Sequence, residues 1–181
     1  YLWTKDGEEL THHKGAVTLK TERLILRKFK KDDYKDIFQW ASNPKVNRFV
    51  SYQPHKTLAD SKKIAKEWAD GAKKIDYYNW AIEYEGKVIG NISVVQNDTL
   101  WEAVIGWQID GPYWNKGIMT EAASAVFGFL FREVGFHRIS AGHDTRNPAS
   151  GKVMEKLGMK KEGFFPQYYY KVGFSTGDAQ R

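Results

Sequence analysis

The chain has 181 residues, of which 41% are hydrophobic and 28% charged, so its size and composition suit one folded domain. It has no cysteine, which excludes disulfides, thiolate metal sites and a cysteine nucleophile. The net charge of +6 fits solvated surface lysines, an anionic cofactor or a nucleic acid. Because the sequence has no run of five basic residues, no zinc-finger spacing and no aromatic RNA-binding signature, we expect no nucleic-acid partner.

The apolar segments of the chain are too short for a membrane protein. The longest apolar run, residues 125–131, falls well below the roughly 20 residues that cross a bilayer, and no signal-peptide pattern opens the sequence. We therefore expect no membrane partner and a cytoplasmic protein, either a monomer or a homodimer. Residues 1–17 are polar and weakly patterned, which indicates an N-terminal extension followed by a single domain over residues 18–181.

The first part of that domain begins with a strand and continues with two helices. Residues 24–26 are apolar and β-prone, which predicts a strand. Apolar residues at helical spacing predict a helix over residues 34–41, ended by an Asn-Pro pair. A threonine and an aspartate at capping-box spacing then open a second predicted helix over residues 57–72.

Three strands follow as a meander. Residues 79–84 and 87–95 are β-prone and flank a Glu-Gly pair, which is typical of a hairpin turn. Residues 101–109 make a third such run, which ends at Asp-Gly-Pro. The pattern predicts an antiparallel three-stranded unit.

The last third of the chain alternates helices and strands. Apolar residues recur every four positions over residues 117–134, which predicts a long helix. Residues 138–143 are a strand candidate, and residues 148–157 predict a short helix ended by a glycine. Residues 164–174 are aromatic and β-prone. The chain is therefore expected to be of the α/β class.

The most informative segment is the junction between the strand 101–109 and the helix 117–134. A strand there runs into a tight, glycine-containing loop, so several backbone N–H groups and the positive end of the helix dipole converge. Such a junction suits a pyrophosphate group, although a plain strand-to-helix turn has the same local sequence. Neither the Rossmann nor the P-loop pattern occurs, which excludes the commonest dinucleotide and nucleoside triphosphate sites.

This junction resembles the acetyl-CoA-binding motif of the GCN5-related N-acetyltransferase (GNAT) family, written Gln/Arg-x-x-Gly-x-Gly/Ala. Trp114 takes the Gln/Arg place, Gly117 the glycine and Met119 the final small residue. The run Trp-x-Lys-Gly followed by Thr-Glu-Ala is most similar to the RimJ/RimL-type branch, which acetylates ribosomal-protein N-termini. That branch often has glycine where Asn115 stands, and asparagine tolerates left-handed backbone geometry better than most residues.

A second resemblance lies further along the chain. Asn-Pro-Ala-Ser at residues 147–150 and Glu-Lys-Leu-Gly-Met at residues 155–159 are similar to the Asn-x-x-Ser and Glu-Lys-x-Gly-Phe elements of the branch. The resemblance covers residues 18–175 and implies the GNAT fold, an α/β (α+β) architecture. Its mixed, mostly antiparallel central sheet is flanked by about four helices. In that fold the strands expected at 101–109 and 138–143 splay apart at a bulge.

The resemblance implies an acetyl-CoA site along that gap. The pantetheine arm pairs with the strand backbone as an added strand would, and a backbone N–H near Ile109 binds the thioester oxygen as it becomes an oxyanion. The cofactor-binding residues implied by position are Trp107, Gln108, Ile109, Asn115, Lys116, Gly117, Ile118, Met119, Thr120, Asn147 and Ser150.

The implied reaction is direct attack of a primary amine on acetyl-CoA in a ternary complex, for which positioning supplies most of the rate. Many relatives protonate the departing thiolate with a tyrosine, but this chain has Met154 there, which leaves the Ser150 hydroxyl or water. Members of the branch often carry a glutamate at the position of Val104. Because alternate residues of a strand share a face, Glu102 is the candidate proton acceptor, and Asp144 is the alternative carboxylate.

Three functions remain open on the sequence. The first is an N-acetyltransferase whose acceptor is a protein N-terminus or a small amine. The second is a non-catalytic module that binds coenzyme A as a sensor or scaffold, and the third is a basic nucleic-acid-binding domain. The histidines lack acidic partners at metal-ligand spacing, so we expect no metal cofactor. Glu102 could also be only an exposed residue at the start of its strand.

Overall fold

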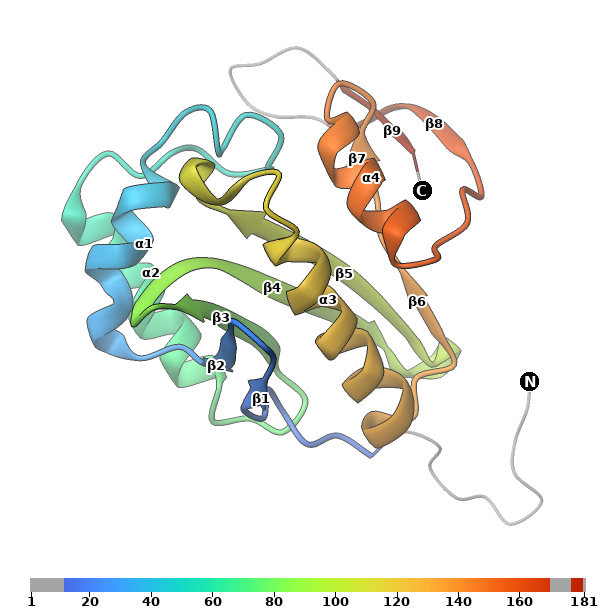
Figure 1. Cartoon of the computed structure of the whole chain (residues 1–181), viewed down its shortest axis with the longest axis horizontal. Helices are drawn as coiled ribbons and strands as arrows, with labels where there is room; N and C mark the ends of the chain where they lie inside the picture. Colours follow the sequence, from blue (N-terminus) through green and yellow to red (C-terminus); the bar gives the residue numbers. More distant parts are fainter. Residues whose placement is uncertain (1–11, 170–176, 181) are drawn as a thin grey trace.

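The structure, a computed structural model, describes residues 12–169 and 177–180 and contains two β-sheets (Figure 1). The larger sheet has six strands in the order β1-β2-β3-β4-β5-β6, with antiparallel neighbours except for the parallel pair β5 and β6. Its strands are β1 (Leu19–Lys20), β2 (Ile25–Lys28), β3 (Tyr78–Tyr84), β4 (Lys87–Asn97), β5 (Glu102–Ile109) and β6 (Arg138–Ser140). The smaller sheet has the order β7-β9-β8, formed by β7 (His143–Asp144), β8 (Phe164–Tyr169) and β9 (Gly177–Gln180).

Within the described part of the chain, four α-helices accompany the sheets, and each follows a local sequence signal. They are α1 (Tyr34–Ala41), α2 (Leu58–Gly71), α3 (Ile118–Phe129) and α4 (Pro148–Lys156). The predicted capping box of α2 is confirmed, because the Asp60 N–H donates to the Thr57 hydroxyl and the Thr57 N–H donates to the Asp60 carboxylate. The helix predicted over residues 117–134 ends as a π-helical turn, Leu130–Val134. Short 3-10 turns occupy Lys31–Asp33, Asp98–Leu100 and Gly111–Tyr113.

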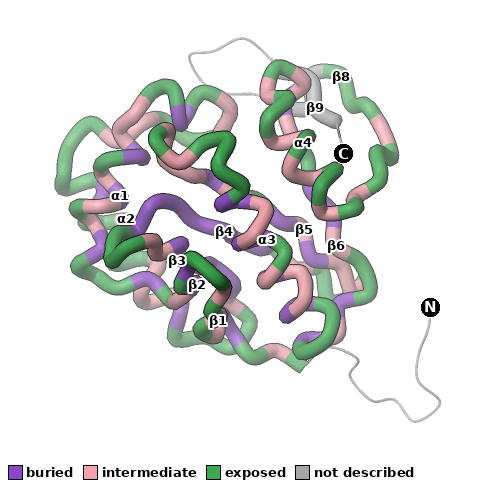
Figure 2. The backbone as a smooth tube through the Cα atoms, in the orientation of Figure 1, coloured by how far each residue is buried: buried purple, intermediate pink, exposed green. Residues whose placement is uncertain are grey.

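Helices cover both faces of the larger sheet. In Figure 1, α3 crosses one face while α1 and α2 lie against the other. Alternation along β3 divides its side chains, since Trp80 and Ile82 pack in the cluster that contains α3, whereas Ala81 packs with α1 and α2. The two apolar clusters bury the centre of the sheet, as Figure 2 shows along β4.

One extra residue in β4 bends the sheet beside the end of β5. Glu83 pairs with Val88 and Ile82 pairs with Gly90, which leaves Ile89 unpaired as a β-bulge. A Cβ atom on Gly90 would lie 2.2 Å from the carbonyl oxygen of Gln108, so only glycine allows β4 and β5 to approach this closely. By contrast, β5 pairs with β4 in regular register from Glu102 to Ile109.

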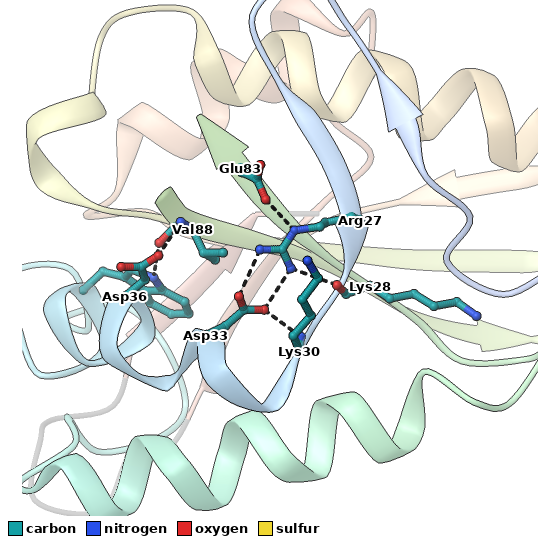
Figure 3. A network of polar contacts seen from close by, with 8 residues as sticks. Arg27, Lys28, Lys30, Asp33, Asp36, Glu83 and Val88 are labelled. Atoms are coloured by element: carbon teal, nitrogen blue, oxygen red, sulfur yellow. Dashed lines mark hydrogen bonds and ion pairs between the residues drawn. The ribbon is translucent and has the colours of Figure 1, made fainter. Parts of the chain in front are cut away.

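A buried ion cluster fixes the start of α1 against the sheet (Figure 3). The Arg27 guanidinium on β2 donates twice to the Asp33 carboxylate, at 2.9 Å in each case, and once to Glu83 on β3. Asp36 accepts a hydrogen bond from the backbone N–H of Val88 on β4. These contacts fix the position of α1 on the sheet, and therefore where the loop after α1 begins.

One expectation differs from the structure, and two concern segments that the structure describes only in part. The single strand expected over residues 138–143 is two strands, because β6 ends at residue 140 and β7 belongs to the other sheet. Residues 12–17 of the expected N-terminal extension contact the domain; for example, Trp80 Nε1 donates to the Val17 carbonyl oxygen at 2.8 Å. The aromatic run 164–174 is a strand as far as residue 169, and its remainder lies outside the described residues, as do residues 1–11.

Candidate active site

The parallel strands β5 and β6 are paired over a short distance only. Across the described residues, β5 and β6 pair at Glu102 with Arg138, Ala103 with Ile139, and Val104 with Ser140. Beyond this point β5 continues to Ile109 in register with β4 alone. We call residues 105–109 the open edge of β5, because no strand of the described residues pairs with their backbone on the β6 side.

The loop after β5 is held in a tight, partly left-handed path. The Asp110 carboxylate accepts a hydrogen bond from the Gly111 N–H at 2.7 Å, and Trp114 Nε1 donates to the Ile109 carbonyl oxygen at 2.8 Å. Asn115 has φ of +60° and Gly117 has φ of +73°. Asn115 therefore adopts the left-handed backbone geometry that asparagine tolerates better than most residues.

The N-terminus of α3 presents free backbone donors next to the open edge of β5. The first helical acceptor is the Gly117 carbonyl oxygen, which the Glu121 N–H reaches at 3.0 Å. The N–H groups of Ile118, Met119 and Thr120 precede that bond, so the helix itself supplies no carbonyl for them. Because Ile118 and Met119 are buried in the core, only their backbones can contact a ligand. The donors and the helix dipole together suit an anion.

A contact that the sequence analysis missed braces this loop from the N-terminal side. The Arg23 guanidinium donates to the Lys116 carbonyl oxygen at 3.1 Å and to the Glu121 carboxylate at 2.7 Å. Thr21 also donates to Glu121. Partial burial would raise the pKa of Glu121, but the hydrogen bonds from Thr21 and Arg23 outweigh it and lower the pKa. Glu121 is therefore ionised at neutral pH, and the positive charge of Arg23 offsets its negative charge in the first turn of α3.

On the other side of the opening, α4 brings three predicted residues together. Asn147 caps the helix, since its side-chain oxygen accepts from the Ser150 N–H at 3.4 Å. Trp107 Nε1 on β5 and Asn147 Nδ2 both donate to the Ser150 hydroxyl oxygen, each at 3.3 Å. Two donors on that oxygen leave the Ser150 proton available to a third group. Met154 lines a cavity of about 150 Å³ between α4 and β6, together with Ser140 and Met159.

Gln108 differs from its neighbours on β5. Trp107 and Ile109 pack on the face of α3, while the side chain of Gln108 points to the face of α1 and α2. There its Nε2 donates to Asn47 Oδ1 at 2.8 Å, and the Tyr52 hydroxyl donates to its Oε1. Only the backbone of Gln108 can therefore contact a ligand at the open edge of β5.

The two candidate carboxylates are both held by neighbours. Glu102 accepts hydrogen bonds from the Ser140 hydroxyl at 2.6 Å and from Arg138 Nε at 3.2 Å, where β5 and β6 still pair. Asp144 is 6% exposed and accepts three hydrogen bonds from Arg146, which lower its pKa. Glu102 shares its strand face with Gln108, but six residues along a strand separate them by about 20 Å.

Within residues 12–169 and 177–180, no three His, Asp or Glu side chains come close enough to hold a metal ion. None of the helices in the same ranges combines the length and the apolar character that a bilayer-crossing segment needs.

The open edge of β5, the helix N-terminus at its end and the Asn-capped α4 have the arrangement that the sequence resemblance implied for the donor site. A family model described as the GNAT acetyltransferase domain matches residues 23–160. The chain therefore belongs to the GNAT family, and it is an N-acetyltransferase.

Relatives and solved structures agree with this assignment. The uncharacterized N-acetyltransferase YnaD of Bacillus subtilis is 30% identical over 164 residues, which are 84% of this chain and 94% of the relative. The ribosomal protein uS5-alanine N-acetyltransferase of Escherichia coli is 33% identical over 86 residues, 46% of this chain and 44% of the relative. A crystal structure of a GNAT-family acetyltransferase from Bacillus anthracis is 30% identical, with a TM-score of 0.79 over 91% of this chain and 95% of that one.

Proposed function

We propose that this enzyme transfers the acetyl group of acetyl-CoA to a primary amine, by direct attack in a ternary complex. The observation that carries the proposal is the end of β5–β6 pairing at Val104, with the α3 N-terminus at the far end of the open edge of β5. An amide-bearing chain can pair with such an edge, and a diphosphate at its end meets the helix N–H groups.

The donor binds through two groups of residues in this proposal. The backbones of Trp107, Gln108 and Ile109 pair with the pantetheine arm, and Asn147 and Ser150 face it from α4. The pyrophosphate contacts the loop and the first turn of α3. The loop and helix residues that we propose for this contact are Asn115, Lys116, Gly117, Ile118, Met119 and Thr120. A backbone N–H near Ile109 stabilises the oxyanion that forms when the amine attacks the thioester carbon.

Two proton transfers complete the reaction. The attacking amine nitrogen loses a proton, and the departing thiolate gains one. We assign the second transfer to the Ser150 hydroxyl, whose oxygen already accepts two hydrogen bonds. For the first transfer, Glu102 is the candidate and Asp144 the alternative; because Glu102 lies about 20 Å along β5 from Gln108, it would take this proton through intervening water molecules. The low pKa of Asp144 makes it the weaker base.

The proposed acceptor is a protein N-terminus or a small amine. A relative whose name states that it acetylates the alanine of a ribosomal protein supports the first choice. The acceptor's amine must be neutral when it attacks, so the rate should rise with pH until the amine or its proton acceptor is fully deprotonated.

Two measurements test this function in sequence. Calorimetry with acetyl-CoA at millimolar concentration detects even a weak site of about 4 kcal/mol. Thiol release is then followed with four amines: an alanine-initiated peptide amide, spermidine, an aminoglycoside and glycine. Binding with amine-dependent thiol release supports the proposal. Absence of acetyl-CoA binding refutes the donor site, and binding without amine-dependent thiol release refutes the proposed acceptor chemistry.

A further inference from the structure

Three polar side chains form a hydrogen-bonded chain, in which Gln108 on β5 joins Asn47 and Tyr52 of the loop after α1. The side-chain amide of Asn47 has a fixed orientation. Asn47 is fully buried, and its Nδ2 donates to the carbonyl oxygens of Trp40, Ala41 and Asn43 at 2.8–3.0 Å. A flipped amide would place oxygen against three carbonyl oxygens, so the Asn47 Oδ1 must face away from them and accept.

That orientation determines which atoms of Gln108 and Tyr52 donate hydrogen bonds and which accept them. Because Asn47 Oδ1 accepts, the Gln108 side chain must donate to it through Nε2, and its Oε1 then faces Tyr52. Gln108 Oε1 can only accept, so the Tyr52 hydroxyl must donate its proton. The Tyr52 oxygen consequently has lone pairs left for accepting and no proton left to give. It is a site for an N–H donor and not for a carbonyl or a carboxylate.

The position of this oxygen relates it to the reaction. Tyr52 reaches β5 from the face of α1 and α2, whereas the α3 N-terminus and Ser150 lie on the opposite side of the strand. An attacking amine needs a route to the thioester that the donor does not fill. Tyr52 is 37% exposed, so part of its side chain is open to an acceptor that arrives on this face.

We propose that Tyr52 binds the acceptor amine, whose N–H donates to the phenol oxygen, and that Gln108 and Asn47 are positioning residues that hold this oxygen in its acceptor-only state. The inference rests on the proposed function and adds to it a residue that contacts the acceptor. A primary amine has two N–H groups when neutral. One can therefore remain on Tyr52 while the other proton leaves during attack.

The titration of Tyr52 agrees with a binding role. Burial of the hydroxyl raises the pKa of Tyr52 to about 12, although the hydrogen bond to Gln108 acts in the opposite direction. At neutral pH the group therefore stays a phenol and keeps its proton on Gln108. A general base has to lose its proton before it can act, so Tyr52 orients the amine and does not deprotonate it.

The test is the variant Tyr52→Phe, which removes only the oxygen and keeps the ring. With acetyl-CoA and the panel amine that gives the fastest thiol release, we expect the KM for the amine to rise about 10-fold, as loss of one hydrogen bond implies. The kcat, the acetyl-CoA affinity measured by calorimetry and the slow hydrolysis of acetyl-CoA without amine should stay near wild type. Tyr34→Phe is the matched control, because Tyr34 lies on α1 and its ring contacts Lys62.

A double variant separates binding from general loss of structure. Gln108→Met removes both polar contacts of the chain, and Tyr52→Phe in that background should add less than a twofold rise in KM, because the two residues act as one unit. An unchanged amine KM in Tyr52→Phe, or an equal loss in acetyl-CoA affinity, would overturn the inference while leaving the proposed function intact. A wild-type enzyme that acetylates none of the four amines removes the proposed function and this inference with it.

Discussion

The substitution Gly117→Ala tests whether the α3 N-terminus holds the diphosphate of acetyl-CoA. Gly117 has φ of +73°, and a Cβ atom there would approach nothing nearer than Arg23 Nη2 at 3.7 Å. The fold has room for the methyl group, so the cost to the unfolding free energy is the left-handed strain alone, about 1–2 kcal/mol. The same Cβ would project at the helix N-terminus, where a diphosphate must approach the backbone closely. We expect the acetyl-CoA affinity to fall by at least about 10-fold, or 1.4 kcal/mol.

Gly158→Ala is the matched control for this strain. Gly158 ends α4 with φ of +78° and has no atom within 4 Å of its would-be Cβ. Urea unfolding should show similar losses of stability for the two variants, while calorimetry with acetyl-CoA should separate them. Gly117→Val should lose more affinity than Gly117→Ala, and Lys116→Ala should show only a small, salt-sensitive loss. If Gly117→Ala binds acetyl-CoA as tightly as Gly158→Ala, the diphosphate does not lie at this helix terminus.

Three other substitutions test separate parts of the site. Glu102→Gln should lower the acetylation rate about 10²-fold at neutral pH with acetyl-CoA affinity intact, and the loss should shrink at high pH; an unchanged kcat and pH profile would eliminate Glu102 as the proton acceptor. The pKa of Asp144 is lowered from 3.8 in the folded state, so its pairing with Arg146 stabilises the fold at neutral pH and is lost as the pH falls through the folded pKa. Asp144→Asn should therefore unfold at lower urea than wild type at pH 7 and match it well below pH 3.8, and equal midpoints at pH 7 would contradict this. Gly90→Ala should lower the unfolding free energy by about 1–3 kcal/mol, because its Cβ would collide with the carbonyl oxygen of Gln108; a variant as stable as wild type in urea would mean that β4 and β5 can separate without cost.

Elements whose signals are local could be predicted from the sequence. The capping box before α2, the apolar stripe of α3 and the asparagine cap of α4 each lie within a few residues of the helix they specify. Hydrogen bonds inside a helix join near neighbours, so its sequence carries most of the information. The loop and helix terminus that we propose for the donor could be named from the sequence for the same reason, since they are one continuous segment.

Features that depend on distant parts of the chain could not be predicted. The strand expected over residues 138–143 divides because β9, from the far end of the chain, pairs with β7. Arg23 and Glu121 lie 98 residues apart, and the sequence around each residue has no pattern that predicts their contact. The direction of Gln108 depended on its partners Asn47 and Tyr52, which come from a loop with no periodic pattern. Each of these contacts requires the folded sheet to bring its members together.

The short pairing of β5 with β6 has a mechanical consequence. Only three residue pairs join the strand that leads to α3 with the strand that leads to α4. Beyond these pairs, β5 and the segment that follows β6 are joined through side chains and not through paired backbones, as where Trp107 Nε1 donates to the Ser150 hydroxyl oxygen. An extended ligand that bonds to the β5 backbone and to α4 would act as the missing strand, so it would have to be released before α4 could move away from β5. Resistance to local opening in this protein should then depend on the ligand as much as on the side chains of its core.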